Sequence, residues 1–362
     1  MKLIIRFLLA LFFISLCYII GIVAYATMTD FDPPEVMPSE VIAHSEKKII
    51  KDSILNFATW NVGYGGLGEN MGFFYSGGAY LTSGDKRVRQ DLDEVQTNIA
   101  GTLKFLDQSN VDFYLFQEVD VDSKRSHYID QLDLYAKAKP DYACHLSTNF
   151  DVQYLPIPIL EFWNTYGKAL SGLGTLSRYE PVEANRLTLP GRFDWPDYTF
   201  QLDRCIGYFK YQLANGKSLV VLNIHNSAYD KGGVLKKQQV AFFKDLAIKE
   251  YEAGNYVVAG GDWNQVAPTV SPDLFWAKKL EEPTTKHNMD ADLFPADWQW
   301  AYDTINPTCR SSSTPFVKGK SRVTLIDYFL VSPNVEVLKT RGINMDFKYS
   351  DHQPVFLKVR LK

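Results

Sequence analysis

Cysteine is scarce in this chain of 362 residues, which contains four. One of them, Cys17, lies in an apolar N-terminal run, so three remain elsewhere: Cys144, Cys205 and Cys309. That number is too small for a disulfide-stapled scaffold or a cysteine-rich zinc site, and it allows at most one bridge of undefined pairing. The sequence also lacks a His-Glu-x-x-His motif, which argues against a helical zinc site.

A dominant charge of one sign is lacking as well. The chain has 38 Lys and Arg residues against 42 Asp and Glu residues, a formal net charge of −4. A tight nucleic-acid binder ordinarily carries a basic patch, and the short runs 86–89, 124–125 and 318–320 are each more typical of a solvated face. Low-complexity blocks are absent, so the composition indicates a globular, enzyme-sized protein.

The long apolar run of the chain lies at its N-terminus. Lys2 and Arg6 precede an uncharged run over 7–27, which is about the length that crosses a bilayer. We expect residues 1–29 to form an uncleaved anchor with the rest of the chain outside the cytoplasm, because positive flanks stay inside. The small-x-small triplet at 24–26 leaves open the alternative, secretion after signal cleavage.

Beyond this segment the sequence predicts one folded domain. Residues 30–52 contain Asp32-Pro33-Pro34 and mixed charges, which are typical of an extended tether. Residues 53–362 show no linker, repeat or shift in composition. We therefore expect one folded domain over 53–362, large for a single core but suited to two packed sheets.

Helix-like and strand-like segments alternate along this domain. Apolar residues at spacings of three and four predict helices over about 88–106 and 234–253. Short apolar runs predict buried strands at 111–116, 218–224, 256–259 and 323–330.

Polar side chains stand at the ends of such runs, a pattern that core packing does not require. They are Asn61, Glu118, His225, Asp262, Asn264, Asp327 and the pair Asp351-His352. Oxygen atoms of Glu118, Asn61 and Asp351 are the ligands that magnesium or manganese prefers. An imidazole such as His352 acts as a base or as a partner of phosphate when a carboxylate holds its ring, and Asp327 is the candidate for that task. Together these residues predict metal-assisted hydrolysis of a phosphoester.

Six clusters in this order resemble the endonuclease/exonuclease/phosphatase superfamily. They are Trp60-Asn61, Gln117-Glu118, Asn223-Ile224-His225, Gly261-Asp262-Trp263-Asn264, Ile326-Asp327-Tyr328 and Ser350-Asp351-His352. The superfamily includes DNase I-like nucleases, abasic-site endonucleases, neutral sphingomyelinases and inositol polyphosphate phosphatases, and the resemblance covers about 55–361. It implies an α/β fold, a four-layered sandwich of two packed mixed sheets flanked by helices.

The resemblance also implies roles for single residues. Glu118 would be the principal ligand of Mg²⁺, or of Mn²⁺, with Asn61 and Asp351 beside the metal. Asp262 would position or activate water, Asn264 would orient the phosphate, and His225 would stabilise developing charge. His352, held by Asp327, would be the second catalytic imidazole. Whether Asp262 or His352 takes the proton of the water stays open.

The sequence indicates the residues that contact substrate less clearly than it indicates the catalytic residues. The run 172–178 resembles a family strand that ends in Ser-Arg, which makes Arg178 a candidate, and Arg204 is a second candidate for contact with phosphate. Residues 63–85 match no branch of the superfamily, and we expect substrate choice to depend on them. The aromatic stretches 73–75 and 193–196 are candidates for exposed contact with substrate or membrane.

The resulting expectation is a magnesium-dependent phosphodiesterase on the extracytoplasmic side of a membrane. A phospholipid head group or another exported phosphoester suits an enzyme anchored next to a bilayer. The alternatives are a membrane-tethered or secreted nuclease acting on nucleic acid and, from a different class, a non-catalytic binding module on the same fold. No protein partner can be inferred from the sequence.

Overall fold

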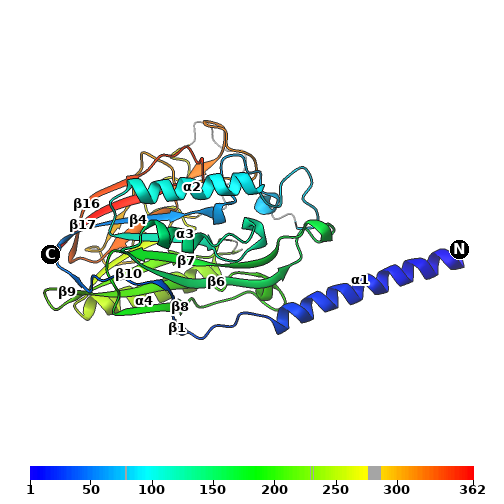
Figure 1. Ribbon diagram of the computed structural model, residues 1–362, viewed down its shortest axis with the longest axis horizontal. Coiled ribbons are helices and arrows are strands. Elements are labelled where there is room, and N and C mark those ends of the chain that lie inside the picture. The colour runs from blue at the N-terminus through cyan, green and yellow to red at the C-terminus, as the bar shows by residue number, and fades with distance from the viewer. Residues whose placement is uncertain (78–79, 229, 231, 276–286) are drawn as a thin grey trace.

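Two β-sheets face one another at the centre of the protein, and helices cover their outer faces (Figure 1). The computed structural model describes residues 1–77, 80–228, 230, 232–275 and 287–362. Within these residues the helices are α1 (Lys2–Met28), α2 (Leu92–Gln108), α3 (Gln131–Ala138) and α4 (Val234–Glu252). Short 3-10 turns are η1 (Gly63–Gly65), η2 (Phe74–Gly77), η3 (Lys124–Ser126), η4 (Phe162–Asn164) and η5 (Asp197–Phe200).

The first sheet, called sheet A, has the strand order β1-β8-β9-β10-β11-β15-β12, with β3 paired to β9. Its strands are β1 (Val36–Pro38), β3 (Ile49–Ile50), β8 (Glu183–Thr188), β9 (Cys205–Leu213), β10 (Ser218–His225), β11 (Tyr256–Asp262), β12 (Gln299–Ala301) and β15 (Asp327–Val331). The central pair β10 and β11 is parallel, whereas β9 and β15 run antiparallel to their neighbours in that pair.

The second sheet, called sheet B, has the order β16-β17-β4-β5-β7-β6-β2. Its strands are β2 (Glu40–Ala43), β4 (Ile54–Asn61), β5 (Phe113–Asp120), β6 (Ala143–Leu155), β7 (Gly167–Ser177), β16 (Val335–Gly342) and β17 (Val355–Leu361). Again one central pair, β4 with β5, is parallel. A separate small pair consists of β13 (Cys309–Arg310) and β14 (Val323–Thr324).

Alternation along the strands builds the layers, because successive side chains point to opposite faces. In β10, Leu219 and Val221 pack between the sheets, while Val220 and Leu222 pack on the outer face with Phe243 of α4. Sheet B buries its outer face under α2 and α3 in the same way, in a cluster that includes Trp60, Phe116, Val95, Ile99 and Leu132. The α/β fold of two mixed sheets flanked by helices is therefore confirmed.

Several predicted elements have different bounds in the structure. The strand predicted at 111–116 is β5 (Phe113–Asp120) and includes Glu118. The helix predicted from residue 88 begins at Leu92, because Val88 packs with Phe74 in a separate apolar cluster. The strand predicted over 323–330 is two strands, β14 and β15. The break occurs where the hydroxyl Oγ1 of Thr308 accepts hydrogen bonds from the backbone N–H groups of Ile326 and Asp327, each at 3.0 Å.

The N-terminal part of the chain combines a projecting helix with edge strands. Helix α1, blue in Figure 1, extends away from the domain, and it is long and apolar enough to cross a membrane by length and composition. The residues 30–52, for which the sequence predicts an extended tether, are extended but hydrogen-bonded to the domain. Their strands β1 and β3 pair with β8 and β9 in sheet A, and β2 pairs with β6 in sheet B.

Candidate active site

The alternation that packs the core also brings polar side chains into the space between the sheets. Phe57 of β4 and Val221 of β10 point into the inter-sheet core, and the residues an even number of positions further along these strands are Asn61 and His225. The inward row of β15 begins at Asp327, which lies directly opposite Asp262 of β11. The site therefore forms at one edge of the core, where inward-facing rows of both sheets end.

Glu118 reaches this edge through an irregularity in β5. The register of β5 against β7 shifts between Phe116 and Val119, and Glu118 has a positive φ of 54°. Such a bulge turns a side chain away from the regular alternation, and bulges of this kind re-aim side chains beside active sites. Glu118 Oε1 accepts a hydrogen bond from Asn61 Nδ2 at 3.0 Å, so β4 and β5 both position it.

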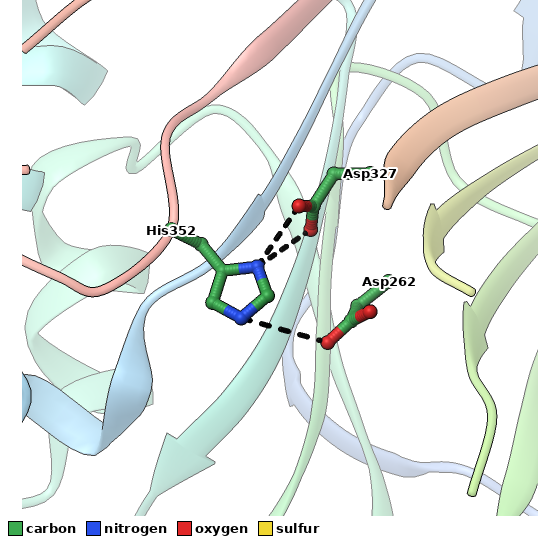
Figure 2. A group of neighbouring side chains, drawn as sticks. All are labelled: Asp262, Asp327 and His352. Atoms are coloured by element: carbon green, nitrogen blue, oxygen red, sulfur yellow. Dashed lines mark hydrogen bonds and ion pairs between the residues drawn. The ribbon is translucent and has the colours of Figure 1, made fainter. Parts of the chain in front are cut away.

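His352 joins two acidic side chains from sheet A (Figure 2). Its ring nitrogen Nδ1 lies 2.9 Å from Asp327 Oδ2, and the other nitrogen, Nε2, lies 3.7 Å from Asp262 Oδ2. All three side chains are buried. Burial lowers the pKa of the His352 imidazole, but the negative charge of Asp327 outweighs this and holds the pKa well above its ordinary value.

Asp262 lies at the centre of the cluster. Its Oδ2 accepts a hydrogen bond from Asn61 Nδ2 at 3.1 Å and lies 3.6 Å from His225 Nε2. The same His225 nitrogen is 3.8 Å from Glu118 Oε1. One carboxylate oxygen of Asp262 thus faces imidazoles from both sides, an arrangement suited to holding a water molecule and moving its proton.

Asn264 follows in a tight turn after β11. It has a positive φ of 51°, which asparagine tolerates better than most residues, and its backbone N–H donates to Asp262 Oδ1 at 2.8 Å. Its side-chain Nδ2 donates to the carbonyl oxygen of Asn226 at 3.0 Å. The turn holds both the Asp262 carboxylate and the Asn264 amide at the same edge of the sheet.

Asp351 is buried at the same edge, one residue before His352. Burial raises the pKa of its carboxyl group to about 6, with the charge of Glu118 adding to the shift and the charges of His352 and Arg310 opposing it. The backbone carbonyl of Asp351 accepts a hydrogen bond from the Arg310 N–H at 2.8 Å. Two carboxylates at this edge therefore repel one another.

Comparison with known proteins gives the family. A model of the Endonuclease/Exonuclease/phosphatase family matches residues 58–352. The chain belongs to this family. No curated protein matches it.

Solved structures of the Endonuclease/Exonuclease/phosphatase family share the fold at low sequence identity. One from Bacteroides vulgatus has a TM-score of 0.54 at 17% identity, covering 86% of this chain and 100% of that one. One from Beutenbergia cavernae DSM 12333 has a TM-score of 0.52 at 18% identity, covering 85% and 72%. D. rerio TDP2, complexed with a single-stranded DNA product, has a TM-score of 0.52 at 14% identity, covering 85% and 100%.

The donor set at the Glu118 edge fits a hard divalent cation of the kind that enzymes of this family generally use. The charges of two carboxylates, Glu118 and Asp351, act on one another at this edge, and their oxygen atoms are the ligands that such a cation prefers. Asn61 lies alongside and holds Glu118 through its Nδ2, while its own oxygen accepts from the Gly63 N–H. A cation held there removes the repulsion that contributes to the raised pKa of Asp351. The ligand atoms of Asp262, Asp327 and His352 also lie within 4.8 Å of one another. The Asp327 carboxylate, however, already contacts the His352 ring at 2.9 Å, so this group is less suited to hold a cation.

The structure separates the two arginines predicted to contact substrate. Arg178 pairs with Asp112 at 2.9 Å, before β5 begins, so it lies at the opposite end of that strand from Glu118. Arg204 directly precedes β9, in which Ile206 is opposite Ile224 of β10. The backbone of Arg204 therefore lies at the same end of sheet A as His225, whereas Arg178 is outside the cluster.

Three polar residues beneath the site, Gln117, Asn223 and Ser350, were given no role in the sequence analysis. Gln117 Nε2 donates to Asn223 Oδ1 at 2.7 Å, which links sheet B to sheet A below Asn61 and His225. Ser350 Oγ donates to the backbone carbonyl of Asn61 at 2.8 Å and joins the loop before β17 to β4. Gln117, Asn223 and Ser350 each lie within two residues of a predicted site residue. This closeness in sequence is the feature from which their supporting role could have been predicted.

The residues 63–85, expected to set substrate choice, begin directly at the site. Gly63 donates its N–H to Asn61 Oδ1 at 3.0 Å, and Tyr64 follows with a positive φ of 44°. Further along, Phe74 is buried in an apolar cluster with Phe150, so the stretch 73–75 is mainly core. Residues 78–79 of this segment lie outside the described part of the chain.

Proposed function

We propose that this chain is a divalent-metal-dependent phosphodiesterase that uses activated water. The observation that carries the proposal is the position of Asp262 Oδ2 between two imidazoles, 3.6 Å from His225 Nε2 and 3.7 Å from His352 Nε2. A carboxylate flanked in this way takes a proton from water while the imidazoles stand ready for an anionic phosphate.

Each residue has a distinct task in the proposed reaction. Glu118, with Asn61 and Asp351 beside it, would hold magnesium or manganese, which would supply positive charge next to the phosphate. The water oxygen forms the new bond to phosphorus, its proton passes to Asp262, and the bond to the leaving oxygen breaks. His225 and His352 stabilise the negative charge that develops, and the amide of Asn264 orients the phosphate. These roles follow from the positions of the three side chains around Asp262.

Asp327 acts as a positioning residue. Its carboxylate contacts the His352 ring at 2.9 Å and 3.0 Å through both oxygens, and it is fully buried. This contact sets the orientation of the ring and favours its charged form. The opposite nitrogen of His352 is thereby directed toward Asp262 and the reacting phosphate.

We further propose that α1 remains as a membrane anchor and that the domain acts on the extracytoplasmic side. Support comes from the apolar composition of α1, its projection away from the domain, and the positive residues at its N-terminus. A phosphodiester that is part of a membrane lipid is then within reach of the domain without diffusion through solution.

The test is hydrolysis by the full chain in detergent micelles, with bis(p-nitrophenyl) phosphate, a choline phospholipid and supercoiled plasmid as parallel substrates. Each is assayed with Mg²⁺, with Mn²⁺ and with a chelator. We expect metal-dependent cleavage that falls by at least about 100-fold in His352→Ala. The matched control is His44→Ala, which removes an exposed imidazole paired with Glu180 at 2.7 Å far from the site.

The pattern across substrates separates the alternatives. Cleavage of the phospholipid in preference to plasmid supports the lipid phosphodiesterase, whereas metal-dependent nicking of plasmid would make the chain a nuclease. No turnover of any of the three substrates with either metal would contradict the proposal and favour a binding module. Equal loss in His352→Ala and His44→Ala would also contradict it, since the effect would then be structural.

A further inference from the structure

Exposed apolar side chains gather at the turn between β6 and β7. Leu160, Phe162 and Trp163 are 61%, 68% and 68% exposed. Tyr80 and Leu81, also exposed, lie beside them, because the N–H groups of Ile159 and Leu160 donate to the carbonyls of Tyr80 and Leu81 at 2.9 Å each. Tyr80, Leu81, Leu160, Phe162 and Trp163 are called the apolar tip.

Hydrogen bonds and ring packing hold the two segments of the apolar tip together. Ser83 donates to the Glu161 carboxylate from its N–H at 2.7 Å and from its hydroxyl at 2.8 Å. The rings of Phe162 and Trp163 pack edge to face with centroids 4.9 Å apart. An exposed apolar surface that is held in place in this way indicates a contact with an apolar partner.

Helix α1 lies against the base of the same turn. Its face at Tyr18, Ile22 and Tyr25 lines a shared hollow with Gln153 and Tyr154, close to the end of β6. In Figure 1 the turn after β6 lies on the side of the domain from which α1 projects. The apolar tip therefore has the anchor helix as its neighbour.

The length of α1 sets how close the bilayer comes to the domain. The uncharged run 7–27 of α1 spans about 30 Å at 1.5 Å per residue. The hydrocarbon core of a bilayer is also about 30 Å thick. A bilayer crossed by this run therefore includes the level of Tyr18 and Ile22, where α1 lies beside the end of β6.

Aromatic side chains at this level match the chemistry of a bilayer surface. Tryptophan and tyrosine are enriched at membrane–water interfaces, where an apolar ring and a polar N–H or O–H are both satisfied. Trp195, also exposed, donates its Nε1–H to Thr27 Oγ1 at 3.1 Å at the end of α1. Trp195 thus places an indole ring at the end of α1, and Trp163 places a second one in the apolar tip.

The catalytic residues lie at the same end of sheet B as the apolar tip. In the register of β5 against β7, Asp120 is opposite Ser171, and β7 continues from there back to Gly167 at the turn. Phe113, at the far end of β5, is opposite Ser177. A surface that contacts the apolar tip therefore also faces the Glu118 edge of the site.

We propose that the apolar tip inserts into the interfacial layer of the bilayer that α1 crosses and turns the site toward lipid head groups. The inference rests on the part of the proposed function that keeps α1 in the membrane; it does not depend on turnover. A lipid surface is the partner, rather than a second copy or another protein, because α1 brings the bilayer to this level.

The test uses the full chain with Cys17→Ser, reconstituted into vesicles of phosphatidylcholine with phosphatidylglycerol. Trp163→Cys carries an environment-sensitive nitrobenzoxadiazole label. Val182→Cys, 63% exposed and directly before β8 at the end of sheet A away from His225, is the matched control. The three remaining cysteines are buried. We expect lipids with a nitroxide near the head group to quench the label at position 163 at least two-fold and to leave that at 182 unchanged.

Other outcomes overturn the proposal. Equal quenching at both positions would show that the apolar tip has no preferred contact with lipid. No quenching at position 163 would show that the turn lies away from the bilayer. Shielding of position 163 from aqueous iodide without quenching by lipid would indicate a second copy or another protein as the partner. Leu160→Cys repeats the measurement if Trp163→Cys fails to fold. Hydrolysis of bis(p-nitrophenyl) phosphate is followed in parallel, so loss of the proposed activity is distinguished from loss of lipid contact.

Discussion

His352 Nδ1 lies 2.9 Å from Asp327 Oδ2, while Nε2 of the same ring lies 3.7 Å from Asp262 Oδ2 (Figure 2). The two carboxylates belong to neighbouring antiparallel strands, and they are directly opposite one another in register. The ring comes from the loop before β17, in the other sheet. One imidazole thus joins the two sheets at the edge where the reaction is proposed to occur.

This contact predicts the effect of Asp327→Asn. The amide keeps the shape of the side chain but removes the charge that raises the pKa of His352. We expect kcat to fall by about 100-fold to 10,000-fold, and the limb of the pH–rate profile that reports His352 to move to lower pH. Steady-state kinetics across pH provide the measurement. Asp245→Asn, on the exposed face of α4, is the control, and a lower kcat with an unmoved profile would contradict a positioning role.

The sequence singled out the residues that the structure brings together better than it predicted their surroundings, and the reason is physical. Asn61, His225 and Asp327 end or begin strands whose apolar alternation is local, so their positions follow from short stretches of sequence. Thr308 and Arg310 contribute through space: Thr308 accepts from the Asp327 N–H at 3.0 Å, and the charge of Arg310 acts on Asp351. No local pattern marks such contacts.

The pairing of the edge strands also could not be predicted from local sequence. Ser39, in the segment expected to be a tether, shares a hydrogen bond of 2.8 Å with Ser147, which is 108 residues away in sequence. Proline and mixed charges correctly indicate extended backbone there, but pairing depends on partners in β6, β8 and β9. Extended conformation is a local property of the chain, whereas the position of an edge strand is set by the completed sheets.

A buried ion pair beside the site predicts strong coupling between two residues. Arg125 binds Asp120 through Nε at 2.9 Å and Nη2 at 2.7 Å, with the two side chains 8% and 0% exposed, and the Tyr64 ring lies 3.9 Å from its guanidinium. Arg125→Met leaves the Asp120 charge buried and unpaired, so we expect unfolding to become easier by about 3–5 kcal/mol. Denaturant titration measures this change.

The double variant Asp120→Leu with Arg125→Met provides the control for that prediction. Because it removes both charges, we expect it to recover most of the loss seen in Arg125→Met alone. If the losses of unfolding free energy in Asp120→Leu alone and Arg125→Met alone simply add in the double variant, the two side chains are not coupled. The cycle therefore separates an electrostatic effect from a loss of packing against Tyr64.

The close approach of two strands below the site predicts that Gly261 tolerates no side chain. A Cβ at this position would lie 1.9 Å from the carbonyl oxygen of Ile224 in β10, so the parallel pair of β10 and β11 would have to separate. We expect Gly261→Ala to cost more than about 3 kcal/mol of stability. Gly216→Ala, with a φ of +82° and open space around it, should cost about 1–2 kcal/mol. Equal costs by denaturant titration would contradict the steric argument.

Finally, a buried imidazole outside the site predicts how stability depends on pH. Burial lowers the pKa of His145 to about 4, whereas an unfolded histidine has a pKa near 6.5. As the pH falls from about 6.5 to about 4, the unfolded chain therefore takes up this proton first, and the stabilisation present above pH 6.5 is lost, by about 2–3 kcal/mol at pH 4.5. In His145→Gln this contribution is absent, so the difference in unfolding free energy between pH 7.5 and pH 4.5 should shrink by that amount. His287→Gln, at an exposed position, is the control, and an unchanged difference in His145→Gln would refute the assignment.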